Sequence, residues 1–134
     1  MSQSNYNRSQ VYRNSLVLRD LSDALGHYFL GDALGRSRRT QSLRSSIAES
    51  LVNDASLLPA AIAQVYQSNS DNNRRKNVHF INIITHNIIS YCNGLEHDGI
   101  KEKEYVQLLR GELKTFRKSF KKWRKSIFNN FNEI

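Results

Sequence analysis

Apolar residues recur along this chain at intervals of three and four positions, which is the period of an amphipathic α-helix. No segment alternates apolar and polar residues for long enough to indicate a β-strand. The pattern divides into four segments, and we expect each of them to form one helix. Their predicted bounds are residues 11–30, 40–67, 74–93 and 101–131. The chain is therefore predicted to be all-α.

Each predicted helix carries one apolar stripe that would face a common core. The four stripes, in chain order, consist of Val11, Leu18, Leu21, Leu25 and Tyr28; Leu43, Ile47, Leu51, Ala55, Leu58, Ile62 and Val65; Ile81, Ile84, Ile88, Tyr91 and Leu95; and Leu109, Leu113, Phe116, Phe120, Trp123 and Ile127. Four such helices joined by short loops pack most simply as an antiparallel, up-down-up-down four-helix bundle. We expect residues 11–134 to form this single domain and residues 1–10, which are polar, to be a disordered tail.

Glycine and proline positions bear on where the helices end. Gly31 and Gly35 should break the first helix, and Gly94 should end the third in a left-handed cap. Pro59 interrupts the second stripe, and a proline inside a helix costs about 3 kcal/mol. Because the stripe continues in phase across the proline, we expect a kinked helix. The alternative is a new helix that begins near Leu57 and is capped by Ser56.

The positive charge of the chain is concentrated in the second half of the last predicted helix. The whole chain has a formal net charge of +8, and the segment 110–125 alone carries eight basic residues against the single acid Glu112. The basic residues are Arg110, Lys114, Arg117, Lys118, Lys121, Lys122, Arg124 and Lys125. Like charges four residues apart destabilise a helix, and a phosphate backbone would offset that repulsion by releasing counterions. The segment therefore predicts a nucleic-acid-binding surface, with a solvated or protein-binding face and a lipid-binding face as alternatives.

Two smaller basic clusters lie near the ends of the predicted helices. Arg74, Arg75 and Lys76 begin the third helix, and in an up-down bundle they would lie at the same end as the basic half of the last helix. We therefore include them in the predicted nucleic-acid interface. The other cluster lies at the first connection, where it either extends a basic surface or solvates a loop. Its members are Arg36, Arg38, Arg39 and Arg44.

Arg74 and His79 have the R-x4-H spacing seen in HEPN ribonucleases, helical-bundle proteins whose arginine and histidine cleave RNA. A histidine that acts as general acid and base beside a phosphate-binding arginine suits that reaction. A HEPN-like ribonuclease therefore stays as an alternative function.

The rest of the sequence offers little further chemistry. His27, His86, His97 and Cys92 show no metal-ligand spacing, and there is no glycine-rich phosphate loop. We therefore expect no catalytic residue, metal or other cofactor. No apolar run approaches the roughly eighteen residues of a membrane span, so we expect no membrane association and a cytoplasmic location.

One segment of the second predicted helix resembles a family signature. Residues 56–64, with the sequence SLLPAAIAQ, resemble the S-I-P-x-N-I-A-E-G signature of the bacterial four helix bundle protein family. Ala61, Gln64 and Val65 depart from the Asn, Glu and Gly of that signature. Residues 112–123 are loosely similar to a pattern near the end of one branch of the family, the accessory variability determinants (Avd) of diversity-generating retroelements.

The resemblance implies a function as well as a fold. Avd proteins form a basic pentameric barrel that binds the reverse transcriptase of the retroelement and RNA. The leading hypothesis is therefore a non-enzymatic accessory protein, a homo-oligomer and pentameric by resemblance, that holds RNA or an RNA–DNA hybrid for a partner reverse transcriptase. A plain protein-interaction bundle is the third interpretation.

Overall fold

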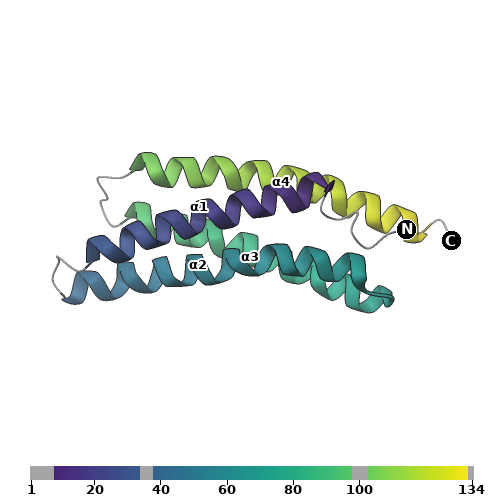
Figure 1. The fold of residues 1–134 in the computed structure, drawn as a ribbon, viewed down its shortest axis with the longest axis horizontal. Coiled ribbons are helices and arrows are strands. Elements are labelled where there is room, and N and C mark those ends of the chain that lie inside the picture. The colour runs from purple at the N-terminus through teal and green to yellow at the C-terminus, as the bar shows by residue number, and fades with distance from the viewer. Residues whose placement is uncertain (1–7, 34–37, 98–102, 133–134) are drawn as a thin grey trace.

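The computed structural model describes residues 8–33, 38–97 and 103–132, and these residues form four helices (Figure 1). They are α1 (Gln10–Ala33), α2 (Arg38–Gln67), α3 (Asp71–His97) and α4 (Lys103–Asn132). No strand occurs in the described part of the chain, so the all-α prediction is confirmed there. Residues 1–7 of the predicted tail lie outside the described residues, and Gln10 already belongs to α1.

The four helices form a closed ring around one core. Contacts join α1 to α2, α2 to α3, α3 to α4, and α4 back to α1. The end of α1 and the start of α2 lie at one end of the molecule, and the end of α2 and the start of α3 lie at the other (Figure 1). The α3–α4 seam therefore brings the start of α3 close to the second half of α4. None of the described helices combines the length and the apolar character that a membrane crossing requires.

The core is built largely from the predicted stripes, with corrections at two positions. Tyr28 and Leu43 were predicted to be in the core, but their side chains are 45% and 60% exposed, while Phe29 and Arg44 are buried in their place. One row of buried positions in α2 (residues 44, 48, 51, 55, 58, 62 and 65) alternates spacings of four and three. The predicted stripe follows this row from Leu51 onward, but Leu43 and Ile47 each precede a buried position by one residue, which is about 100° around the helix.

Arg44 therefore belongs to the core and not to a basic surface. Its side chain is 2% exposed, and its guanidinium carbon lies 6.0 Å from the centroid of the Phe29 ring. An aromatic face attracts a guanidinium and partly compensates for its loss of water. The prediction that Arg44 extends a basic surface at the first connection is wrong, because its charge does not reach solvent. Arg36 and the side chains of Arg38 and Arg39 lie outside the described residues.

The second helix continues through Pro59. α2 is helical from Arg38 to Gln67, and the buried stripe crosses Pro59 in phase as the sequence predicted. A new helix beginning near Leu57 is therefore excluded. Ser56 does not cap a helix start, because its hydroxyl donates a hydrogen bond of 2.7 Å to the carbonyl oxygen of Asn53 in the preceding turn.

Two glycines that were predicted to end helices lie inside them. Gly31 precedes the end of α1 at Ala33, and Gly94 precedes the end of α3 at His97, so the predicted left-handed cap at Gly94 is wrong. Gly94 instead provides room for α2. A Cβ at this position would lie 2.9 Å from Cδ1 of Ile47.

Two aromatic side chains predicted to pack in the core are only partly buried and use their polar edges between helices. The Tyr91 hydroxyl donates a hydrogen bond of 2.6 Å to Oδ2 of Asp54, which joins α3 to α2. Nε1 of Trp123 donates a hydrogen bond of 2.9 Å to the hydroxyl oxygen of Tyr66, which joins α4 to the end of α2. Both side chains pack against the core. Their hydrogen bonds satisfy the polar groups that partial burial removes from water.

Candidate nucleic-acid interface

A hollow of about 720 Å³ lies along the seam between α3 and α4. We call it the α3–α4 groove. Helix α3 contributes Asn82 and Ile89, and the buried side chains of Leu113 and Phe120 contribute apolar atoms from α4. Six of the eight predicted basic residues of α4 line it: Arg110, Lys114, Arg117, Lys118, Lys121 and Arg124. Their spacing keeps them on the side of α4 next to the core stripe, so the fold gathers them in one concave surface.

Five of these six cations carry uncompensated charge. Within the part of the chain that the structure describes, the five α4 cations of the groove other than Arg110 make no ion pair and no hydrogen bond. Their side chains are all exposed. Lysine and arginine offer only donors, so such a surface lacks acceptors. The groove is therefore suited to an anionic ligand that spans several positive charges.

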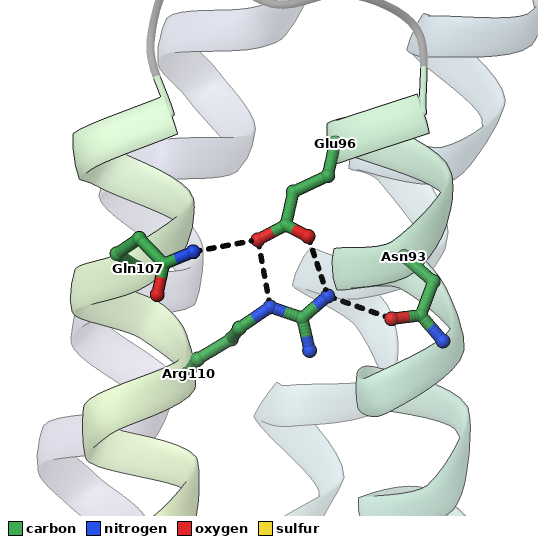
Figure 2. A network of polar contacts seen from close by, with 4 residues as sticks. All are labelled: Asn93, Glu96, Gln107 and Arg110. Carbon is green, nitrogen blue, oxygen red and sulfur yellow. Dashed lines mark hydrogen bonds and ion pairs between the residues drawn. The ribbon is translucent and has the colours of Figure 1, made fainter.

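Arg110, one of the residues predicted to contact nucleic acid, is held by side chains of α3 (Figure 2). Its Nε and Nη2 atoms donate hydrogen bonds of 2.7 and 2.9 Å to the two carboxylate oxygens of Glu96, and Nη2 also donates one of 2.6 Å to Oδ1 of Asn93. Gln107 donates to Oε1 of the same carboxylate at 3.1 Å. The Arg110 guanidinium is thus committed to α3. It joins the two helices at one end of the groove, so the unpaired positive charge of the groove comes from the other five cations.

This pairing changes the titration of both groups. The hydrogen bonds from Arg110 hold the pKa of Glu96 below its usual value, and the same bonds raise the pKa of Arg110. A carboxyl group whose pKa is lower in the folded than in the unfolded protein stabilises the fold above the unfolded pKa. That contribution is lost as the pH falls through the folded pKa.

Glu96→Gln should therefore destabilise the protein in a pH-dependent way. We expect a loss of about 1 kcal/mol in the free energy of unfolding at pH 7, since the pair is bidentate and partly buried. The difference from the unmodified protein should shrink as the pH falls below the ordinary glutamate pKa of about 4.3 and then through the lowered pKa of Glu96 in the folded protein. Urea denaturation of both proteins at neutral and at acidic pH measures this difference in the free energy of unfolding. A difference that is the same at both would show that the ion pair does not stabilise the α3–α4 seam.

A smaller hollow of about 180 Å³ continues the groove toward the start of α3. We call it the end pocket. Its lining consists of Arg75, Val78, His79, Asn82, Arg124 and Phe128, so Asn82 and Arg124 line both hollows. The predicted proximity of the basic start of α3 to the basic half of α4 is confirmed for Arg75 and Arg124.

Arg75 is held by two contacts at the mouth of this pocket. Its Nε donates a hydrogen bond of 3.0 Å to Oδ2 of Asp71, one helical turn earlier. Its guanidinium carbon lies 4.7 Å from the centroid of the Phe128 ring on α4. Both contacts restrict the side chain, and neither uses its two terminal amino groups.

Four residues of the predicted interface line neither hollow. They are Arg74, Lys76, Lys122 and Lys125. Arg74 is half-buried, whereas the three lysines are exposed. Lys125 has a suitable angle on α4 but lines neither hollow. The three lysines would contact a larger ligand only outside the two hollows.

The spacing of the proposed ribonuclease pair does not bring its members to one hollow. Arg74 and His79 are five residues apart, which is roughly 140° around a helix. Arg75 and His79 are one turn apart and line the end pocket together. The residues Arg75, His79 and Asn82, at spacings of four and three, are the signal that the sequence offered for this pocket.

The remaining candidate ligands form no site in the described residues. Cys92 is buried, and burial raises the pKa of its thiol to about 11, so it is a packing residue. The described residues contain no group of three or more His, Cys, Asp or Glu side chains that could hold a metal ion.

Searches against protein-family models, curated proteins and solved structures find no match for this chain. The assignment of the groove and the end pocket therefore rests on their own geometry and charge.

Proposed function

We propose that this protein binds RNA, or an RNA–DNA hybrid, along the α3–α4 groove. The observation that carries the proposal is the row of five exposed, unpaired cations on one wall of a single groove. Phosphates spaced along a strand would neutralise them and release counterions, which is the main source of affinity in binding that does not depend on sequence. Contacts of this kind position a strand and carry little base specificity.

The residues of the groove favour nucleic acid over a merely solvated face and over a lipid-binding face. A merely solvated helix face usually interleaves acids with its bases, and this wall contains none. A helix that lies on a lipid surface presents large apolar side chains beside its cations. In α4 the large apolar residues next to the groove, Leu113, Phe116 and Phe120, are buried in the core.

The wider role in our proposal is that of a non-enzymatic accessory protein in the cytoplasm. Consecutive helices join at alternate ends of the molecule (Figure 1), so we take the fold to be an antiparallel, up-down-up-down bundle. A homo-oligomer and a partner reverse transcriptase are supported by the resemblance of residues 56–64 to the Avd-containing family. A reverse transcriptase gene with template and variable repeats beside this reading frame would support that partner, and an unrelated neighbourhood would argue against it.

The purified protein should bind a short single-stranded RNA with strong salt dependence. If all five unpaired cations contact phosphates, the slope of log affinity against log salt should be about −3 to −4, since each contact contributes roughly 0.7 for a single strand. Fluorescence anisotropy at several salt concentrations measures this slope. Absence of binding at roughly 50 mM salt, or an affinity that does not change with salt, would contradict the proposed function.

A further inference from the structure

The end pocket differs from the groove in the kind of anion that it suits. The groove offers cations in a row, whereas the end pocket surrounds one small volume of about 180 Å³ with donors from two helices. Arg75, His79 and Asn82 come from α3, and Arg124 comes from α4. Such convergence suits one compact anion better than a continuous backbone.

The contacts of Arg75 leave its two terminal amino groups to bind that anion. Asp71 engages Nε, and the Phe128 ring packs against the guanidinium, so the side chain has little freedom left to lose on binding. The two terminal amino groups make no hydrogen bond within the described residues. A planar guanidinium with free amino groups binds two oxygens of a phosphate at once. Arg124 adds a second guanidinium, which has no partner among the described residues.

The charge of the pocket favours a phosphate monoester over a phosphodiester. A backbone phosphodiester carries one negative charge, whereas a monoester carries about −1.5 to −2 near pH 7 and has three terminal oxygens. Arg124 carries an unpaired charge, and Arg75, whose charge Asp71 partly offsets, keeps two terminal amino groups for hydrogen bonds. Together with the donors of His79 and Asn82, they match the three terminal oxygens of the second ligand. Because Asn82 and Arg124 also line the groove, a strand in the groove would reach this pocket with one of its ends.

We propose that the end pocket binds the terminal phosphate of the nucleic-acid strand that lies in the α3–α4 groove. The inference rests on the proposed function for the strand, but the pocket itself requires only a phosphate monoester. Both a 5′-phosphate and a 3′-phosphate have this chemistry, and the experiment distinguishes them.

The test compares three RNAs of the same sequence, with a 5′-phosphate, with a 3′-phosphate, or with hydroxyl groups at both ends. The unmodified protein should bind one phosphorylated RNA about tenfold more tightly than the hydroxyl form, since one hydrogen bond to a charged group can supply such a factor. Arg75→Gln should abolish this preference. Arg75→Lys should also abolish most of it, because lysine keeps the charge but not the planar pair of donors.

Lys76→Gln is the matched control, since Lys76 is the neighbouring residue, is exposed and lines neither hollow. It should lower the affinity for all three RNAs by a similar factor and leave their ratio unchanged. Circular dichroism melts confirm that each variant is folded. A ratio near one in the unmodified protein, or a ratio that Arg75→Lys preserves, would overturn the inference while leaving groove binding intact.

A second measurement decides the matter if none of the RNAs binds. Inorganic phosphate is titrated into the isotope-labelled protein, and the resonances of the Arg75 Nε–H group and the Phe128 ring are followed by NMR. Saturable shifts in the unmodified protein that Arg75→Lys removes would support the pocket even though the proposed strand binding had failed. Absence of such shifts would overturn the inference as well.

Discussion

Replacing Lys118 and Lys121 together by glutamine should weaken RNA binding and flatten its dependence on salt. Both side chains line the α3–α4 groove, are exposed and have no partner among the described residues. Two phosphate contacts to a single strand contribute about 1.4 to the salt slope, which corresponds to roughly 25-fold in affinity between 1 M and 0.1 M salt. The slope should therefore become less negative by about 1.4, and the affinity near 0.1 M salt should fall roughly 25-fold.

The chain provides a control with the same change of charge on the same helix. Lys122 and Lys125 are exposed residues of α4 that line neither hollow. Replacing both by glutamine should produce a clearly smaller change of slope, because only long-range attraction is lost and salt screens it. Glutamine is a good helix former, so both double variants should keep their helix content. Equal losses in the two variants would show that net charge, and not the groove, determines binding. No loss in either would leave the basic residues of α4 as a solvated surface.

The sequence predicted the basic residues but not how the fold divides them. Helical spacing placed Lys114, Lys118, Lys121 and Lys125 on one face of α4, and the first three of these line the groove. Lys125 has the same helical spacing but lines neither hollow. A periodic pattern describes one helix at a time, so it contains no information about which neighbour is in register with which turn.

The same limit explains Arg110 and Arg44. Glu96 lies fourteen positions before Arg110 and on another helix, so only the register of α3 against α4 brings the carboxylate to the guanidinium. Arg44 was assigned to the surface from its charge. It is buried over Phe29 because the buried row of α2 includes residue 44 and not its apolar neighbour Leu43. From residue type alone, Leu43 was the expected core position. The fold class could be predicted because it depends on the period of the pattern. The arrangement of the site could not be predicted, because it depends on which residues of different helices come into contact.

Gly26→Ala should destabilise the protein by about 1–3 kcal/mol, which is the usual cost of overpacking a closely packed contact. Gly26 lies where α1 packs closely against α2. A Cβ there would lie 2.1 Å from Cγ2 of Val52 and 3.2 Å from the carbonyl oxygen of Ala48. The valine side chain is stiff at its first torsion, and the carbonyl belongs to helix backbone, so neither can move away freely. Urea denaturation measures the loss.

Gly111→Ala is the control, since it makes the same substitution inside another helix. Gly111 is exposed in α4, and a Cβ there would meet no atom within 4 Å. Only helix propensity should then change, and alanine is favoured over glycine by about 1 kcal/mol, so this variant should be more stable than the unmodified protein. The two substitutions should therefore change the free energy of unfolding in opposite directions. A Gly26→Ala variant as stable as Gly111→Ala would show that α1 and α2 are not packed as closely as the structure has them.

The cause of the Gly26 effect can be isolated by removing the nearest atom. Val52→Ala deletes Cγ2, the atom that a Cβ at position 26 would approach at 2.1 Å. In the double variant, Gly26→Ala should therefore cost less than it does alone, and the coupling between the two sites should be about 0.5–2 kcal/mol. The cost that remains should reflect the Ala48 carbonyl, which neither substitution moves. If the two changes add without coupling, the loss in Gly26→Ala arises from something other than the contact between α1 and α2.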